Sequence, residues 1–286
     1  MKSMPMKFSF DGILRSGGKG LVYLIVIGVA VIMILPFYWM IITAVMPVQD
    51  IQSFPPKFFP NRITGSHFTE AFNKAPWFQY YLNSFVVATG SVGLSLLFGL
   101  FAGYAFAVYR FPLQNFFFIL ILSTIMIPVQ VTSVALYMMV AKLQWVDTFP
   151  GILAPNFASA FAVFLLRQHI QSIPGDLIDA ARIDGSGEIR IVATIIAPLL
   201  KTTIATVGLI LFLSSWNDFL WPVVVISSER MRTIPIGIAL FKDPYGVVNY
   251  GPLMAATVIS TVPMLIAYIF TQKHLVRGIA MTGMKG

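Results

Sequence analysis

Residues 21–45 read LVYLIVIGVAVIMILPFYWMIITAV, a stretch that contains no Asp, Glu, Lys or Arg. An α-helix needs about 20 mostly apolar residues to cross the hydrocarbon core of a bilayer. This stretch is too long for the apolar core of a signal peptide, and no cleavage pattern of the A-x-A type follows it, so we expect it to be retained. It predicts a helix that spans a membrane.

Five more segments have the same character. They are 84–109, 113–140, 149–166, 199–227 and 252–272. The whole chain is 57% hydrophobic and only 10% charged, whereas soluble domains carry roughly 25% charged residues. So few charges cannot keep a soluble surface hydrated. The sequence therefore predicts an all-α membrane protein with six transmembrane helices.

The positions of Lys and Arg predict the orientation, because cytoplasmic loops carry an excess of both. With the N-terminus inside, the predicted cytoplasmic segments hold twelve of these residues and the outer loops hold seven. The cytoplasmic set is Lys2, Lys7, Arg15, Lys19, Arg110, Arg167, Arg182, Arg190, Lys201, Lys273, Arg277 and Lys285. We therefore expect both ends inside: a lead over 1–20, a six-helix domain over 21–276 and a tail over 277–286.

Sequence motifs for chemistry are missing. There is no cysteine, and the three histidines are scattered, so no catalytic or metal-binding residues are predicted. Gly17-Gly18-Lys19-Gly20 departs from the nucleotide-binding P-loop at its first glycine and at its final Ser or Thr. The first three spans hold no acidic or basic residue of the kind that relays protons. If the chain transports a solute, the energy must come from a partner, and no cofactor is expected on the chain itself.

The second predicted span carries small residues every four positions. They are Ser91, Ser95, Gly99, Gly103 and Ala107. Small residues at this spacing let two helix backbones approach closely in lipid. The face either lines a translocation path or a subunit interface, or packs against another helix of the same chain.

The long loop 172–198 is the most informative segment outside the spans. Pro174 and Gly175 end the preceding element, and Asp176 can cap a short helix. Gly185 can take the left-handed conformation that ends a helix. Such a helix is marginal alone in water. We expect it to dock on a partner protein's groove, on the membrane surface or on the chain's own loops. If nothing covered the helix, four of its apolar residues would be exposed to water: Leu177, Ala180, Ala181 and Ile183.

The residues of this loop resemble a known family. Residues 179–185 read DAARIDG, with Ile195-x-Ala197-Pro198 after them, and are similar to the EAA motif of permeases in bacterial ABC importers. The wider stretch IPGDLIDAARIDG at 173–185 resembles the carbohydrate type, the maltose and glycerol-phosphate group. Asp179 stands where the motif has Glu, and Ala197 where it has Leu. Further family-like stretches are Pro55-Pro56-Lys57, Asn83-Ser84, Ile127-Pro128 with Gln130, 164–168, 215–222 and 276–278.

The resemblance implies a type I ABC importer permease fold in a bacterial inner membrane. The implied partners are a second homologous permease, two ATP-binding subunits that hold ATP and magnesium, and an extracytoplasmic solute-binding protein that delivers a sugar or sugar derivative. The chain would be a transport subunit rather than an enzyme. A stand-alone secondary carrier for a small polar solute and a membrane-embedded enzyme are the alternatives.

The resemblance also implies which residues couple transport to ATP hydrolysis. The ATPase-coupling candidates are Asp179, Ala180, Ala181, Arg182, Asp184, Gly185 and Pro198. We expect the alanines and Gly185 to allow close docking and the charged residues to make polar contacts or orient the helix. Ala181→Glu should then uncouple ATP hydrolysis from uptake.

The stretch 215–222, SWNDFLWP, has two interpretations. Trp216 can be an aromatic anchor at the membrane edge. Alternatively, Trp216, Asn217 and Asp218 face the pathway or the binding protein, because an acid at the end of a span should face water or protein. The resemblance further implies that the loop 228–251 contacts the binding protein and that the C-terminal tail contacts the ATPase subunits.

Overall fold

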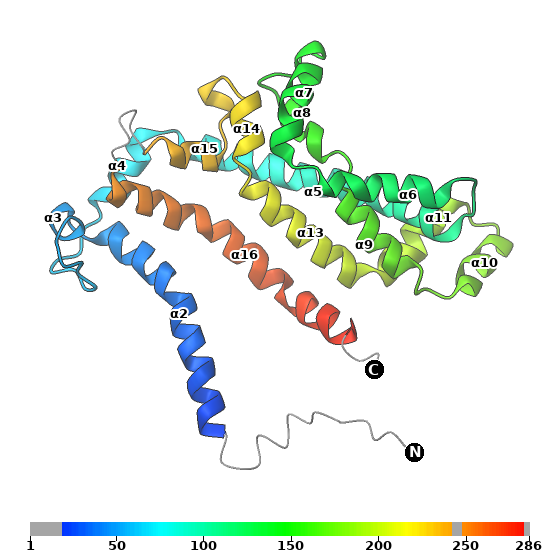
Figure 1. Ribbon diagram of the computed structural model, residues 1–286, viewed down its shortest axis with the longest axis horizontal. Coiled ribbons are helices and arrows are strands. Elements are labelled where there is room, and N and C mark those ends of the chain that lie inside the picture. Colours follow the sequence, from blue (N-terminus) through cyan, green and yellow to red (C-terminus); the bar gives the residue numbers. More distant parts are fainter. Residues whose placement is uncertain (1–18, 242–247, 283–286) are drawn as a thin grey trace. The chain divides into compact units, whose positions relative to one another are not determined.

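The computed structural model describes residues 19–241 and 248–282, with side chains over 20–241 and 248–272. Its regular structure in these ranges is helical (Figure 1). The chain divides into two units, and each is considered by itself. One contains the residues up to Ala71 together with Val248–Val258, and the other contains Phe72–Val247 together with the residues from Ile259.

The first unit contains α2 (Lys19–Val45), α3 (Val48–Ile51), the start of α4 (Ser66–Lys74) and the first turns of α16 (Tyr250–Thr282). The Asp50 carboxylate pairs with Lys57 and accepts hydrogen bonds from the backbone and side-chain N–H groups of Asn61. These bonds, that of Lys57 first, hold the pKa of Asp50 below its ordinary value. The segment from Lys57 to Asn61 is thereby tied to α3.

The second unit is organised around α5 (Trp77–Val108), which packs lengthwise against α9 (Ala160–Ile170) and α13 (Lys201–Trp216). The other α-helices are α6 (Gln114–Ser123), α7 (Val129–Lys142), α8 (Phe149–Leu153), α10 (Gly175–Ile183), α11 (Glu188–Ile191), α12 (Ala197–Leu199), α14 (Leu220–Val225) and α15 (Ile234–Ala239). Short 3-10 turns are η1 (Thr124–Met126), η2 (Ala154–Asn156) and η4 (Glu229–Met231), and η3 (Val192–Ile196) is a π-helical turn.

Three single helices are long and apolar enough to cross a membrane, and three bent helix pairs bring the number to six if each pair is counted as one span. The single helices cover Gly20–Val45, Trp77–Val108 and Tyr250–Gln272. The bent pairs are Gln114–Met126 with Val129–Lys142 at 105°, Phe149–Asn156 with Ala160–Ile170 at 48°, and Glu188–Leu199 with Lys201–Trp216 at 85°. The helical fold class is therefore confirmed, but spans three to five are not the continuous helices that the apolar runs predicted.

Prolines account for much of this bending. A proline lacks an N–H and excludes the helical conformation from the residue before it. Ile127, directly before Pro128, is accordingly extended, with φ −87° and ψ 116°, and α7 begins after the proline. Pro198 lies in the first turn of α12, just before the bend at Leu200. The predicted fifth span, 199–227, is also divided, because α13 ends at Trp216 and α14 is a separate helix.

The small-residue face of α5 packs within the chain. A Cβ added at Gly99 would lie 2.8 Å from Cβ of Ala162, and one at Gly103 would lie 3.0 Å from the backbone nitrogen of Arg167. The Ser95 hydroxyl donates to the carbonyl of Asn156 at 2.7 Å. Of the two roles considered for this face, the structure places it against α9 of the same unit.

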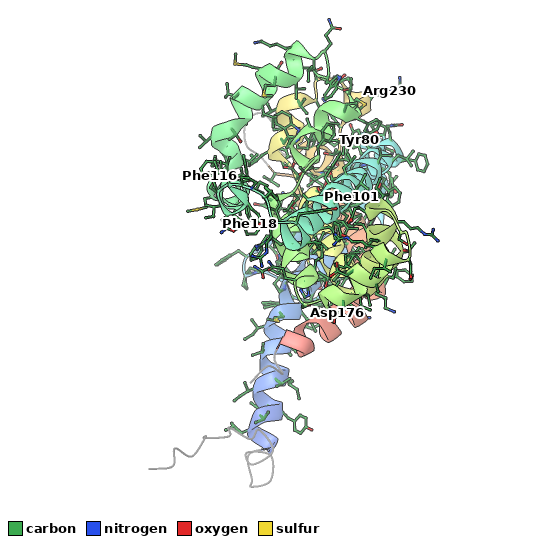
Figure 2. All side chains as sticks on the ribbon, turned by 90° about the vertical axis from the view of Figure 1, so that its right-hand side faces the viewer. Tyr80, Phe101, Phe116, Phe118, Asp176 and Arg230 are labelled. Atoms are coloured by element: carbon green, nitrogen blue, oxygen red, sulfur yellow. The ribbon has the colours of Figure 1, made fainter. Side chains whose placement is uncertain are left out.

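Arg167, at the end of α9, is also held inside this unit. Its Nε donates to the carbonyl of Phe106 at 3.1 Å, and its guanidinium lies 4.1 Å from the ring centroid of Phe118. The helix α6 turns Phe118 inward, at 9% exposure, and Phe116 outward, at 58% (Figure 2). A cation over an aromatic face is attracted by the ring's electron density. Arg167 therefore joins α6 to the α5–α9 pair.

Candidate functional site

The helix α10 lies in the loop that the sequence singled out. Pro174 precedes the helix and makes no side-chain hydrogen bond to it. Asp176 lies in the first turn, where the positive end of the helix dipole stabilises a negative charge. Asp176 was expected to accept the N-terminal N–H groups, and no such bond forms. At the other end Gly185 has a φ of +80°, the left-handed conformation that favours glycine. Ser186 N–H donates to the carbonyl of Ala181 at 2.9 Å and closes the helix.

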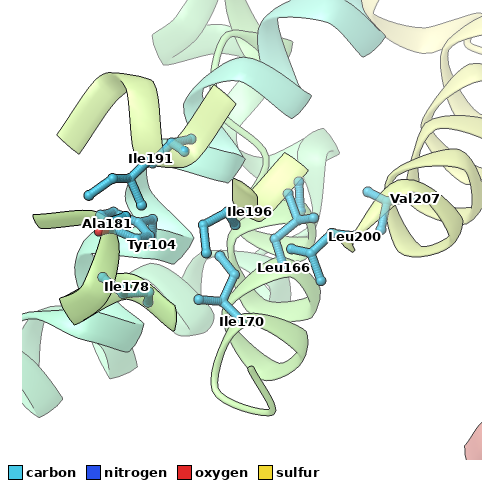
Figure 3. Packing of buried hydrophobic residues seen from close by; sticks show 11 residues of the cluster. Tyr104, Leu166, Ile170, Ile178, Ala181, Ile191, Ile196, Leu200 and Val207 are labelled. Carbon is cyan, nitrogen blue, oxygen red and sulfur yellow. The ribbon is translucent and has the colours of Figure 1, made fainter. Parts of the chain in front are cut away.

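One face of α10 is buried in the second unit. Ile178 is 4% exposed and Ala181 is 8% exposed. Both belong to a cluster with Tyr104 of α5 and Ile191 of α11, which Figure 3 shows from close by. The sequence left open whether a partner, the membrane surface or the chain's own residues cover the apolar side of α10. For Ala181 the cover is the chain's own cluster.

The opposite face of α10 is uncovered. Ile183 is 87% exposed and Leu177 is 47% exposed. Ala180, Asp179 and Asp184 are exposed between them. Large apolar side chains so open to solvent on a short helix mark a surface for interaction. The two alanines of the motif therefore lie on different faces of the helix: Ala180 is exposed and Ala181 is buried.

An ionic cluster joins α10 to its neighbours. Arg182 Nε donates to Oε1 of Glu188 at 2.8 Å, and Arg182 Nη1 donates to Oδ1 of Asp179 at 3.1 Å. The hydroxyl of Tyr104 donates to Oε2 of the same glutamate at 2.5 Å. The bond to Glu188 raises the pKa of the Arg182 guanidinium above its ordinary value, so the side chain is charged at any working pH. Arg182 is thus used inside the chain.

Sequence reasoning missed Tyr104 and Glu188. Glu188 lies outside the DAARIDG stretch, and Tyr104 lies 84 residues before it in the sequence. No periodicity or motif connects two residues so far apart, so only the tertiary structure reveals this bond.

Pro198 is not part of the α10 surface. It is exposed and lies in α12, which α11 and η3 separate from α10 along the chain. The residue shapes the bend before α13, and the structure does not bring it together with the other coupling candidates.

Trp216 is buried rather than placed at an exposed edge. It is 3% exposed, its Nε1 donates to the carbonyl of Ser260 at 3.3 Å, and its ring stacks on Phe212. A buried ring offers no surface to lipid, to a solute or to a binding protein in this conformation, so neither interpretation of Trp216 fits. Asn217 is exposed and Asp218 is partly buried, with Oδ1 of Asp218 accepting from the N–H of Trp221 at 3.4 Å.

The described residues contain no group of three or more His, Cys, Asp or Glu side chains that could hold a metal ion. The feature that distinguishes the site is a short helix with one face fixed and one face bare.

A family model described as binding-protein-dependent transport system inner membrane component matches residues 95–281. The chain belongs to this family. The resemblance found in the sequence is therefore confirmed, and this permease is a transport component of the inner membrane rather than an enzyme.

Relatives with known names cover most of the permease. It is 40% identical over 230 residues to the arabinooligosaccharides transport system permease protein AraQ of Halalkalibacterium halodurans, covering 80% of this chain and 82% of the relative. It is 32% identical over 271 residues to the sn-glycerol-3-phosphate transport system permease protein UgpE of Escherichia coli (strain K12), covering 90% and 93%.

Solved structures share the fold of the permease. A crystal structure of a bacterial ABC transporter involved in the import of the acidic polysaccharide alginate aligns with a TM-score of 0.78 at 21% identity, covering 94% of this chain and 99% of that chain. A second, of a bacterial alginate ABC transporter in complex with alginate pentasaccharide-bound periplasmic protein, aligns at 0.63 and 16%. At these identities the comparison shows the fold, which is that of an ABC importer permease.

Proposed function

We propose that this permease moves a sugar or a sugar derivative across the inner membrane as one subunit of a binding-protein-dependent ABC importer. The names of the relatives support the substrate class, since they are associated with arabinooligosaccharides and sn-glycerol-3-phosphate. The proposed partners are a second homologous permease, two ATP-binding subunits and an extracytoplasmic solute-binding protein. The orientation that follows has both ends of the chain in the cytoplasm.

The observation that carries the proposal is the bare face of α10. Burying apolar surface contributes about 25 cal/mol for each Å² removed from water. The exposed side chains of Leu177 and Ile183 therefore favour a partner, while Ile178 and Ala181 hold the helix on its own unit. We propose that a groove of an ATP-binding subunit receives this face, with Ala180 allowing close approach and Asp179 and Asp184 available at its edge.

The energy source supports the same proposal. The sequence has no P-loop, so ATP and magnesium would be bound by the partner subunits and not by this chain. Closure of these subunits would displace α10, and the displacement would change the conformation of the permeases. Gly185 would let the chain turn directly after α10, close to the partner.

Two further contacts belong to the proposal. Asn217 and Asp218, which follow α13, are candidates for the solute pathway or the binding protein, because they place polar atoms beyond the end of an apolar helix. The tail 277–286 is a candidate contact with the ATP-binding subunits. The end of this tail and the N-terminal lead lie outside the described residues.

Ala180→Glu tests the docking face. The change adds a charge to an exposed position, so the permease should fold normally. In proteoliposomes with the whole importer, we expect loss of nearly all ATP-driven uptake, because a charge would lie in a closely packed contact. Ala141→Glu on α7 is the matched control, since Ala141 is also exposed and lies far from α10 in the sequence. The proposal fails if the wild-type chain does not co-purify with an ATP-binding subunit, or if Ala180→Glu transports at the rate of Ala141→Glu.

A further inference from the structure

We infer that Glu188 and Tyr104 are positioning residues that fix the rotation of α10 about its own axis and transmit its displacement to α5 and α13. The inference rests on the proposed function, since it assumes that a partner moves α10. It concerns residues outside the docking face, which would act through Arg182 without touching the partner.

Both carboxylate oxygens of Glu188 accept hydrogen bonds. Oε1 accepts from Nε of Arg182 of α10 at 2.8 Å, and Oε2 accepts from the hydroxyl of Tyr104 of α5 at 2.5 Å and from Nη2 of Arg182 at 3.4 Å. Glu188 is itself the first residue of α11. One side chain thereby connects three helices through charge-assisted bonds, the stronger class of protein hydrogen bond.

These bonds have a role that the apolar cluster cannot perform. Packing of Ile178 and Ala181 holds α10 against the unit, but hydrophobic attraction has no preferred direction. A hydrogen bond weakens steeply when its angle falls. The Arg182–Glu188 pair therefore resists rotation of α10, and this rotation decides whether Ile183 and Ala180 face outward.

Tyr104 anchors the glutamate to a fixed point. The tyrosine is only 3% exposed, and its ring lies in the cluster with Leu166 and Ile191 (Figure 3). A buried hydroxyl that loses its acceptor is costly. Tyr104 thus keeps Glu188 in place. The same bond connects Glu188 to the end of α5 that lies beside α9.

The connection continues toward α13 through the backbone. From Glu188 the chain runs through α11 into η3 and α12, and these segments contact one another in sequence up to α13. Ile191 and Ile196, on α11 and η3, are fully buried in the same cluster. A displacement of α10 that acts on Glu188 therefore acts on the helix that leads into α13.

Arg182 is better explained by this cluster than by a contact with a partner. Its Nε and Nη2 face Glu188, its Nη1 faces Asp179, and its guanidinium lies 5.8 Å from the ring centroid of Tyr109. Every nitrogen of the guanidinium has a partner in the chain. The side chain is therefore held in place by the chain itself.

The test compares Tyr104→Phe and Glu188→Gln with wild type in the whole importer, and measures solute uptake and ATP hydrolysis separately. Both changes keep the shape of the side chain. We expect assembly and hydrolysis to persist while solute moved per ATP falls about tenfold, as expected for loss of a hydrogen bond to a charged group. Tyr137→Phe, on the partly exposed α7, should leave the ratio unchanged. Wild-type ratios in both cluster variants would overturn the inference.

A spectroscopic measurement covers variants that do not assemble. The chain has no cysteine, so Ile183→Cys and Phe98→Cys provide two labelling sites without background. Spin labels there report the position of α10 relative to α5 in the isolated permease. We expect one narrow distance distribution in the otherwise wild-type chain and a broad one after Glu188→Gln. Equal widths would contradict the inference, and this outcome is independent of whether an ATP-binding subunit docks.

A double substitution tests whether the two residues act together. Because Tyr104→Phe and Glu188→Gln remove the same connection, the combined variant should have nearly the ratio of Glu188→Gln alone. Multiplication of the two single effects would show that they act separately, against the inference.

Discussion

The two ends of the α5 helix are held by different sets of bonds. At the end near α10 the bonds involve charged side chains, as in the Arg182–Glu188 pair and the bond from Arg167 to the carbonyl of Phe106. At the end near α15, two neutral side chains of α5 bind backbone groups. Asn83 donates to the carbonyls of Arg230 and Arg232, both at 2.8 Å, and the Ser84 hydroxyl accepts from the N–H of Ile234 at 2.9 Å.

The difference bears on what each end can do. A bond to the backbone fixes the path of a loop regardless of that loop's own side chains, and it does so without charge. The α15 end is therefore a fixed structure. The α10 end instead combines a directional ionic cluster with a bare apolar face. That combination suits a region that another protein binds and displaces.

Trp221→Ala gives the largest expected effect, because Trp221 packs in one apolar cluster with Val87, one turn along α5 from Asn83. Trp221 is 2% exposed, and its Nε1 donates to the carbonyls of Gly151 and Ile152, each at 3.1 Å. Truncating a buried tryptophan costs about 3–5 kcal/mol, so we expect the permease to lose that much free energy of unfolding in detergent. Ala180→Glu at the other end should unfold as wild type does. Equal destabilisation by the two changes would remove the contrast between the ends.

Gly99→Ala tests the packing that joins the two ends. Its new Cβ would be 2.8 Å from Cβ of Ala162, so the α5–α9 pair must separate, at a cost of about 1–3 kcal/mol. Gly93→Ala on the same helix is the control, because no atom lies within 4 Å of its added Cβ. Gly93→Ala should be neutral or should stabilise the permease by roughly 0.4–1 kcal/mol, because alanine lowers the conformational entropy of the unfolded chain. Thermal unfolding of both variants in detergent distinguishes these outcomes, and the same shift in both would argue against close contact at Gly99.

Asp147 gives the smallest expected effect and a pH dependence. Its carboxylate accepts from the N–H groups of Ser227 and Ser228, both at 3.0 Å. Partial burial opposes its ionisation, but these bonds outweigh the burial, and the pKa of Asp147 lies below its ordinary value. The stabilisation is therefore complete above the unfolded-state pKa of about 3.9 and is lost as the pH falls through the lower folded-state value.

Asp147→Ala should cost about 1 kcal/mol at neutral pH, and Asp147→Asn should cost less because it keeps one acceptor and tolerates the φ of 59°. Melting temperatures measured from pH 3 to pH 7 provide the test. The acid-dependent part of the wild-type curve should be smaller in Asp147→Asn. An unchanged curve would mean that another carboxylate is responsible.

The sequence predicted the features that depend on local composition. The apolar runs gave the membrane helices, and Gly185 was placed correctly as the end of α10. The family resemblance rested on residues 173–185 and was confirmed. Pro128 and Pro198 were visible in the sequence, but their effect was missed because an apolar run does not show whether it is straight.

What the sequence could not predict depends on tertiary contacts. A helix as short as α10 has too few turns to define which side is buried, so Ala180 and Ala181 were not distinguished. Trp216 was expected either at the membrane edge or facing the pathway or the binding protein, whereas it is 3% exposed and donates to the carbonyl of Ser260. The Tyr104–Glu188 bond joins residues with no pattern in common.

The apolarity of α2 has a consequence for how the chain is made. This helix carries the highest mean hydropathy of the candidate spans, 2.7, and a segment so apolar can insert into a bilayer without help from other helices. Such a segment is stable as soon as it leaves the insertion machinery. The second unit differs, because the bond from Trp216 to Ser260 forms only after the last span has been synthesised. The first span can therefore wait in the membrane, while the bent pairs reach their final structure only when translation is nearly complete.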